Sequence, residues 1–127
     1  MKIKNSYLEA LSRKDLKGLL EKEFTAKTSF WLAKLFSKLE IESGIYFKAK
    51  QKLIEKHAKK KDGEIVQDGN AVTLENPETF TKELNEILDI EIEFEWEPLK
   101  LDLSKEPNLT IEEMTILILF VEDIENS

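Results

Sequence analysis

The 127-residue sequence contains no cysteine and is poor in the residues that interrupt regular structure, with four glycines and three prolines. Without cysteine, the chain can form neither a disulfide framework nor a thiolate metal site. Collagen-like and low-complexity proteins are excluded because glycine and proline are so scarce. The longest wholly apolar run, Ile116 to Val121, has six residues, whereas a membrane helix needs ~20. We therefore expect a single domain over residues 1–127 and no membrane partner.

Arginine and histidine are also nearly absent, since Arg13 and His57 are the only examples. A single histidine without cysteine cannot build a zinc cluster, and no Ser or Asp stands at a spacing that suggests a catalytic triad. The sequence has no glycine-rich phosphate loop. Met1-Lys2-Ile3-Lys4 leads into polar sequence without the apolar core of a signal peptide. We expect a protein without enzymatic activity, cofactor or metal, located in the cytoplasm.

Charge is plentiful and is divided along the chain. Residues 1–61 contain 16 Lys or Arg against 7 Asp or Glu, a net +9, and residues 62–127 contain 3 against 19, a net −16. The total of −7 therefore conceals a basic half and an acidic half. With no repeat and no linker rich in Pro, Gly or Ser, we expect both halves to belong to one fold.

The basic half is expected to be mainly helical. Residues 2–4 alternate as a short strand would, and helical spacing of apolar residues predicts a helix over 6–22, with Asn5 or Ser6 as its N-cap and Ser12 as an alternative start of a second, shorter helix. A longer apolar stripe, with intervals of three and four residues, predicts a helix over 26–59. At ~1.5 Å per residue this helix would be ~50 Å long, so we expect a kink or break near Ser43-Gly44.

The acidic half is expected to mix strands and helices. Residues 65–66 and 72–74 flank Asp68-Gly69-Asn70 and predict a hairpin. Asn76 before Pro77 predicts a capped helix over 77–88. Strict alternation predicts a strand over 90–97, which Leu99, Leu101 and Leu103 continue beyond Pro98. Thr110 and Glu113 match the capping box of a helix over 110–122, although the β-branched residues of 115–121 also fit a buried strand.

These elements predict an α+β fold. We expect an N-terminal antiparallel helical hairpin with a long second helix, packed on a small antiparallel sheet with short C-terminal helices. Trp31 and Trp96 both lie among periodic apolar positions, so we expect both indoles in the core.

One face of the predicted strand over 90–97 is wholly acidic, with Glu91, Glu93, Glu95 and Glu97 at every second residue. Such carboxylates stand ~6.7 Å apart along the face. They could bind a basic protein partner or copy the charge pattern of a nucleic acid backbone. Alternatively, they could discourage edge pairing or face Lys2 and Lys4 across a ladder.

The predicted helix over 26–59 carries a basic stripe. Its lysines are Lys34, Lys38, Lys48, Lys52, Lys56 and Lys59, followed by Lys60 and Lys61. This stripe could contact phosphates, or it could simply be a solvated helix face. A nucleic-acid-binding domain is usually basic overall, and lysine lacks the bidentate geometry that reads guanine. Nucleic acid is therefore the less favoured partner.

The layout resembles small phage and prophage proteins of low-GC Gram-positive bacteria. The resemblance rests on Met1-Lys2-Ile3-Lys4 before a Leu-rich helix, a Lys-rich long helix ending in Leu53-Ile54-Glu55-Lys56-His57, the Asp-Gly turn region, Phe80 with residues 83–88, the Glu-alternating strand into Pro98, and the closing residues 109–111 and 120–122. It implies a phage accessory or assembly protein, cytoplasmic or virion-associated.

Together these observations favour a non-enzymatic protein that binds a protein partner, either a virion component or a host protein that it inhibits or redirects. The partner-binding candidates are Glu91, Glu93, Glu95 and Glu97. Two alternatives stay open: a nucleic-acid-binding protein that uses Lys48, Lys52, Lys56, Lys59, Lys60 and Lys61, and an acidic mimic of DNA.

Overall fold

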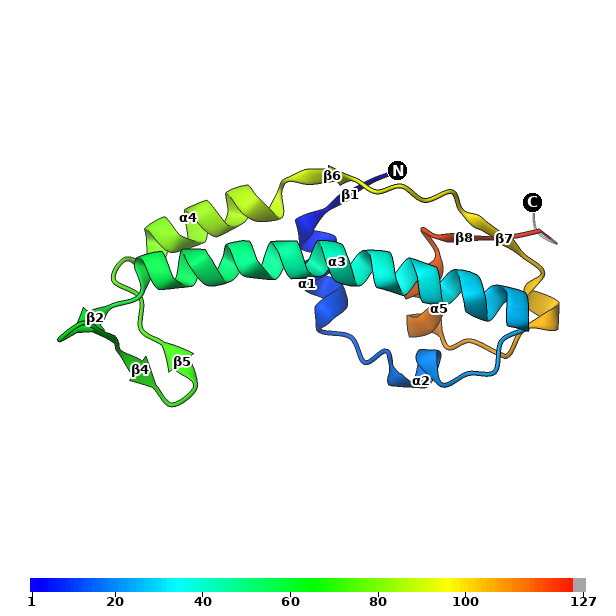
Figure 1. Ribbon diagram of the computed structural model, residues 1–127, viewed down its shortest axis with the longest axis horizontal. Coiled ribbons are helices and arrows are strands. Elements are labelled where there is room, and N and C mark those ends of the chain that lie inside the picture. Colours follow the sequence, from blue (N-terminus) through cyan, green and yellow to red (C-terminus); the bar gives the residue numbers. More distant parts are fainter. Residues whose placement is uncertain (125–127) are drawn as a thin grey trace.

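The computed structural model describes residues 1–124 and has the expected α+β architecture, in which short strands and helices surround one long helix (Figure 1). In chain order the elements are β1 (Lys2–Lys4), α1 (Asn5–Ser12), α2 (Lys17–Leu20), α3 (Ala26–His57), β2 (Lys60–Lys61), β3 (Glu64–Ile65), β4 (Gln67–Asp68), β5 (Ala71–Val72), α4 (Pro77–Leu88), β6 (Glu91–Glu93), β7 (Leu99–Leu101), the 3₁₀ helix η1 (Leu103–Lys105), α5 (Ile111–Leu117) and β8 (Val121–Asp123).

Helix α3 runs unbroken for 32 residues, so the expected break near Ser43-Gly44 is wrong. Gly44 is exposed and has space around it, and the neighbours of α3 hold the helix on both sides of this point, α1 in its middle and α4 along its second half. Its buried residues are Thr28, Leu32, Leu35, Leu39, Tyr46 and Leu53. They reproduce most of the apolar stripe that its sequence predicts. None of the helices within 1–124 is both long and apolar enough to cross a bilayer.

The single helix expected over 6–22 is instead two helices separated by residues 13–16. The Asp15 carboxylate accepts a hydrogen bond from the Lys17 amide at 2.9 Å, and the Ser12 hydroxyl donates to the Glu9 carbonyl at 2.6 Å. Both side chains satisfy backbone groups that a continuous helix would satisfy itself, so α1 ends and α2 begins. The alternative of a second, shorter helix is correct in kind, although it starts at Lys17 and not at Ser12.

Helix α4 has the predicted bounds and the predicted cap. The Asn76 side chain accepts a hydrogen bond from the Thr79 amide, and Pro77 occupies the first helical position. The chain runs along α3 toward the hairpin end and returns through α4, so α4 lies antiparallel beside the second half of α3 (Figure 1). The helix beside α3 is therefore α4, whereas α1 crosses the middle of α3.

Strands β1 and β6 pair antiparallel, and their register places Lys2 opposite Glu93 and Lys4 opposite Glu91. This confirms the strand over 2–4 and, for Glu91 and Glu93, the alternative in which the glutamates face Lys2 and Lys4 across a ladder. The ladder stops at Glu93, so the strand expected over 90–97 is shorter as a paired strand. The inside-outside alternation nevertheless continues to Glu97, because the glutamates stay exposed while Phe94 and Trp96 point inward.

The C-terminal helix is also shorter than its sequence suggests. The capping box of Thr110 and Glu113 is present at the start of α5, but the helix ends at Leu117 and not at Glu122. The chain then turns, buries Phe120, and forms β8 parallel to β7. The Leu99 amide donates to the Phe120 carbonyl at 2.8 Å, so a distant strand decides where this helix stops.

Two small hairpins occupy the end of the molecule beyond α3 (Figure 1). The pair β4 and β5 turns at Gly69, whose φ of 62° is the positive value expected there. The first hairpin along the chain, β2 with β3, turns at Asp62 and Gly63, with φ of 54° and 84°, in a stretch where the sequence predicts only the end of a helix. The Asp-Gly motifs are therefore turns.

The core lies at the opposite end, between α1, the first part of α3 and α5. Its fully buried side chains include Leu8, Leu35 and Phe120, and Phe120 contacts the rings of Tyr7 and Phe94 edge to face. From residue 59 to residue 93, by contrast, every side chain is at least partly exposed. The two ends of α3 thus have very different surroundings.

Candidate functional site

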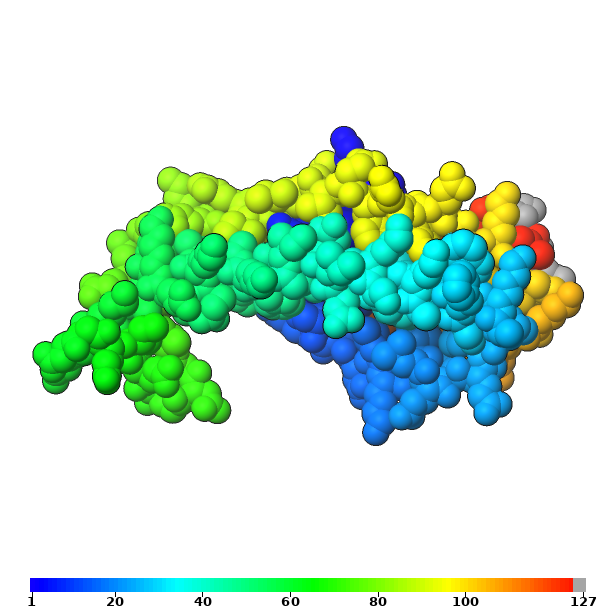
Figure 2. Space-filling model, viewed as in Figure 1, coloured from blue at the N-terminus to red at the C-terminus, as the bar shows by residue number. Residues whose placement is uncertain are grey.

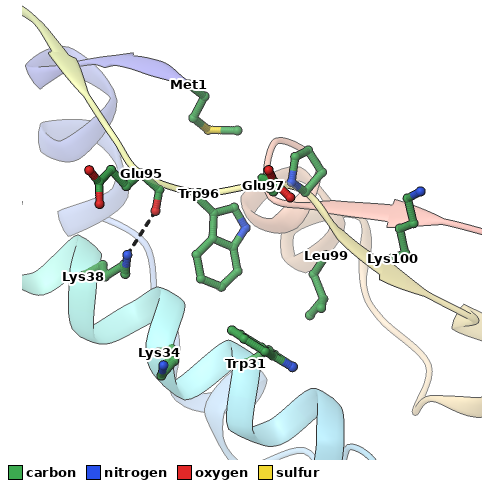
Figure 3. A pocket seen from close by; sticks show the side chains of 10 residues that line it. Met1, Trp31, Lys34, Lys38, Glu95, Trp96, Glu97, Leu99 and Lys100 are labelled. Atoms are coloured by element: carbon green, nitrogen blue, oxygen red, sulfur yellow. Dashed lines mark hydrogen bonds between the residues drawn. The ribbon is translucent and has the colours of Figure 1, made fainter.

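A hollow of about 690 Å³ lies between α3 and the extended chain that follows β6 (Figure 3). We call it the tryptophan hollow. It is lined by Met1, by Trp31, Lys34 and Lys38 of α3, and by residues 95–100. A smaller hollow of about 260 Å³ continues it toward β6, between Ile41 of α3 and residues 93–95. In Figure 2 the residues around 90–100 accordingly lie alongside the first half of α3.

Two indoles form the floor of the tryptophan hollow. Trp31 and Trp96 meet edge to face, with ring centroids 6.4 Å apart and planes at 73°. The Trp96 Nε1 donates to the Phe120 carbonyl at 3.0 Å, which fixes this ring against the core. Trp31 is 36% exposed and Phe30 beside it is 56% exposed. Trp31 therefore belongs to the surface, contrary to the core position expected for it, whereas Trp96 packs on the core.

Lysine side chains line the helical wall of the hollow, and none of them has an ion pair with a carboxylate of residues 1–124. Lys34 Nζ stands 5.4 Å from the ring centroids of both Phe30 and Trp31. Lys38 Nζ donates to the backbone carbonyl of Glu95 at 3.1 Å and ties the extended chain to α3. Lys100 closes the far side. The ammonium groups therefore remain available to an anion from outside.

The acidic candidates divide into two pairs. Glu91 and Glu93 lie in the ladder opposite Lys4 and Lys2, and Glu93 is also 3.7 Å from the N-terminal amine. Glu95 and Glu97 line the tryptophan hollow, are exposed, and have no ion pair with any residue of 1–124. Glu93 thus has a cation within the fold, whereas Glu91 only faces a lysine across the ladder. The second pair presents two uncompensated carboxylates beside two tryptophans.

Other glutamates show what compensated carboxylates look like in this protein. Glu9 Oε2 accepts a hydrogen bond from the Tyr46 hydroxyl at 2.6 Å, and Lys50 Nζ lies 3.2 Å away. Desolvation raises the pKa of Glu9, but the hydrogen bonds from Tyr46, Lys50 and Arg13 outweigh it and hold that pKa below its usual value. In the same way, hydrogen bonds from the Thr110 amide and from Lys22 lower the pKa of Glu113. These carboxylates stabilise the fold.

The basic candidates are also dispersed. Lys48 and Lys52 are exposed on α3, whereas Lys56 Nζ lies 3.3 Å from a Glu83 oxygen of α4. His57 Nε2 lies 2.9 Å from the same Glu83 carboxylate, which makes this histidine a contact between α3 and α4. Lys59, Lys60 and Lys61 lie beyond α3, at the start of the first hairpin. The predicted basic stripe is therefore not one continuous site.

The hollow is lined by aromatic, basic and acidic side chains. Within 1–124, no group of three or more His, Asp or Glu side chains is arranged to hold a metal ion. The groups that converge there are two indoles, ammonium groups and carboxylates. They can stack, bury apolar surface and form ion pairs, which are the interactions of a recognition surface.

Comparison with known proteins gives no relative: no family model matches the chain, and neither a curated protein nor a solved structure matches it. The tryptophan hollow is therefore assessed on its own geometry.

The sequence did contain a signal for Trp31. The buried stripe of α3 passes through Leu32, Leu35 and Leu39. Trp31 precedes this stripe by one residue, so it is rotated ~100° away from Leu32 on the helix surface. An aromatic residue beside the stripe, and not on it, indicates contact with a second element or with a partner.

Proposed function

We propose that the protein is a non-enzymatic binding protein that engages a protein partner through the tryptophan hollow. The observation that carries this proposal is the placement of Trp31 and Trp96 beside Glu95 and Glu97, whose carboxylates have no cation within 1–124. Tryptophan is enriched among the residues that dominate protein interfaces. Exposed charges around an apolar centre add orientation and association rate.

The chemistry of the hollow indicates the kind of segment that it accepts. An apolar or aromatic side chain can rest on the indoles of Trp31 and Trp96, and a lysine or arginine next to it can reach Glu95 or Glu97. Charged groups of both signs line the walls, so the best ligand also carries a carboxylate for Lys34 or Lys100. We therefore expect a mixed-charge segment with an apolar centre.

Selection of peptides from a random library on the immobilised protein tests this proposal. We expect enriched peptides to combine basic residues with an apolar residue and to bind with a Kd of ~1–100 µM. Binding should weaken at least ~10-fold in Trp31→Ala, since the loss of one central anchor costs more than ~1.4 kcal/mol. Ile111→Ala, which truncates the most exposed isoleucine on α5, is the matched control. The proposal fails if no peptide is enriched or if Trp31→Ala binds the selected peptides as the natural protein does.

A nucleic-acid-binding role has one supporting observation, the exposed Lys48 and Lys52 on α3, which have no ion pair within 1–124. Phosphate contacts predict binding that falls steeply with salt. If single-stranded or double-stranded DNA and RNA are not retarded even at low salt, this role is excluded. Lys48→Glu with Lys52→Glu should abolish any retardation that does occur.

The resemblance to phage proteins suggests a setting for the proposed binding. In that setting the protein acts in the cytoplasm of an infected cell or within the virion, and its partner is a virion component or a host protein. The mimicry of DNA is less well supported, because the register places Glu91 and Glu93 opposite lysines, and only Glu95 and Glu97 of these four glutamates extend beyond the ladder. Two carboxylates are a short imitation of a phosphate backbone.

A further inference from the structure

The tryptophan hollow lies on a boundary between a basic and an acidic edge. The extended chain runs antiparallel to α3 (Figure 3). Its residues 93 to 99 therefore lie in turn beside Ile41, Lys38, Lys34 and Trp31 of α3. The lysine side chains of α3 therefore form one edge of the surface, and Glu95 and Glu97 of the extended chain, followed by Lys100, form the parallel edge beside it.

We propose that this surface binds a second copy of the chain, so that the protein forms a symmetric dimer through facing tryptophan hollows. The inference rests on the proposed function and names the partner of the same site. Its basis is that two parallel edges of opposite charge are complementary to themselves after a two-fold rotation. A two-fold axis along their boundary lays the basic edge of one copy over the acidic edge of the other, and the reverse pairing follows by symmetry.

The contacts of this dimer follow from neighbours within one copy. Because Lys38 lies beside Glu95 in a single chain, the two-fold axis brings Lys38 of one copy toward Glu95 of the other. The Trp31 and Trp96 rings come together at the centre, in line with the axis. Both α3 helices then run in the same direction on either side of it.

Each copy also leaves the charges for these contacts unused. Lys38 Nζ bonds to the carbonyl of Glu95 and not to its carboxylate, and Lys34 Nζ lies over aromatic rings. The carboxylates of Glu95 and Glu97 have no ion pair within 1–124. A partner with lysines at matching positions would compensate them without breaking any contact in the fold.

A competing way to pair α3 is disfavoured by charge. Ile41 and Ile45 are 65% and 60% exposed on the outer face of α3, and a two-fold axis across the helix there would pack them against each other. The same axis would set Lys38 of one copy against Lys48 of the other. Like charges placed directly opposite destabilise such a pairing, so the tryptophan hollow is the better self-complementary surface.

The size of the surface predicts a weak dimer. The half of α3 beside the extended chain is ~24 Å long at ~1.5 Å per residue, and two elements side by side are ~20 Å wide. About 500 Å² per copy, or ~1,000 Å² in total, lies at the lower limit for a specific interface. We therefore expect a Kd in the range of ~10–100 µM that rises with salt, because the Debye length falls from ~10 Å at 0.1 M to ~3 Å at 1 M.

Paired charge reversals test the dimer by sedimentation equilibrium up to ~500 µM. The basic edge is reversed in Lys34→Glu with Lys38→Glu, and the acidic edge in Glu95→Lys with Glu97→Lys. Each variant alone should be a monomer, because like charges now face each other across the axis. An equimolar mixture of the two should recover dimers within about threefold of the natural Kd, since every cross-axis contact again joins opposite charges.

The matched controls carry the same change of charge elsewhere. Lys60→Glu with Lys61→Glu lies on the first hairpin, and Glu75→Lys with Glu86→Lys lies just before and on α4; both should dimerise as the natural protein does. A natural protein that is monomeric at ~500 µM refutes the dimer, while peptide binding to the hollow would still support the proposed function. A dimer that survives both reversals, or a mixture that stays monomeric, also refutes it. Circular dichroism confirms that each variant is folded.

Discussion

The two ends of α3 differ in how the chain around them is held. At the end near α5, Phe120 and Leu35 are fully buried and Glu113 is bonded inside the fold to the Thr110 amide and Lys22. At the other end, no residue from 59 to 93 is buried, and the chain after the hairpins is joined to α3 by a backbone bond from Glu75 N to His57 O at 2.8 Å. The first end is stabilised by an extended core, whereas only Leu53 and Ala58 are buried at the second, which relies more on hydrogen bonds near water.

This difference separates the part of the molecule that determines stability from the part that can open. Local opening is easiest where few apolar side chains are buried and the backbone bonds are exposed to solvent. The tryptophan hollow lies at the stable end, where Trp96 is bonded to the Phe120 carbonyl. Its aromatic floor is therefore preorganised, which reduces the entropy that a partner must overcome on binding.

Removal of one aromatic ring at each end of α3 should give the largest difference in the free energy of unfolding. Phe120→Ala should lower the free energy of unfolding by ~3–5 kcal/mol, because a fully buried ring in contact with Tyr7 and Phe94 leaves a cavity. Phe80→Ala on α4 should cost only ~1–2 kcal/mol, since that ring is half-exposed. Urea unfolding followed by tryptophan fluorescence measures both. Equal losses would contradict the contrast between the two ends.

Neutralising Glu9, the partly buried carboxylate that joins α1 to α3, should have the next largest effect. Glu9→Gln keeps the shape of the side chain but leaves Lys50 and Arg13 without their anion, so we expect a loss of ~1–3 kcal/mol. Glu112→Gln makes the same change at an exposed pair, 3.9 Å from Lys14, and should cost less than ~0.5 kcal/mol. Chemical denaturation at pH 7 compares the two variants, and a similar cost for both would show that the bonds of Glu9 contribute nothing special.

The same comparison should depend on pH in one direction. The pKa of Glu9 is lowered in the folded protein by bonds from Tyr46, Lys50 and Arg13, which outweigh the desolvation that raises it. Its stabilisation is therefore complete above the unfolded pKa, about 4.5, and is lost as the pH falls through the lower folded pKa. The stability gap between the natural protein and Glu9→Gln should stay constant from neutral pH to about pH 5.5 and shrink below pH 4.5. A gap that widens in acid would contradict this assignment.

Elements with local determinants were predictable from the sequence. Asn76 with Pro77 gave the bounds of α4, and Thr110 with Glu113 gave the start of α5, because these caps are formed by side chains within a few residues of the bonds that they satisfy. The facing of Lys2 and Lys4 with Glu91 and Glu93 was also predictable, since opposite charges favour that register.

Elements with distant determinants were not predictable. The end of α5 depends on β7, which pairs with β8 and takes the chain out of the helix after Phe120. Because the β6 ladder ends before Glu95, the Glu95 carbonyl accepts a hydrogen bond from Lys38, which lies 57 residues away in sequence. The candidate site was predictable only in part for the same reason. Its glutamates follow from the alternation of the sequence, whereas the exposure of Trp31 beside them depends on how α3 and the extended chain pack together.

The smallest effect should distinguish the two ends most directly. Gly69 at the second hairpin has a φ of 62°, so Gly69→Ala forces an alanine into the left-handed region at ~1–2 kcal/mol. Because this hairpin lies outside the core, the strain should open the hairpin and speed amide exchange there, while the global free energy of unfolding changes by less than ~0.5 kcal/mol. Gly44→Ala is the matched control in α3, where the added methyl meets nothing within 4 Å and should stabilise the helix by ~0.5–1 kcal/mol. If Gly69→Ala instead lowers the global free energy of unfolding by the whole strain energy of the alanine, the hairpins unfold together with the core. The two ends are then one cooperative unit.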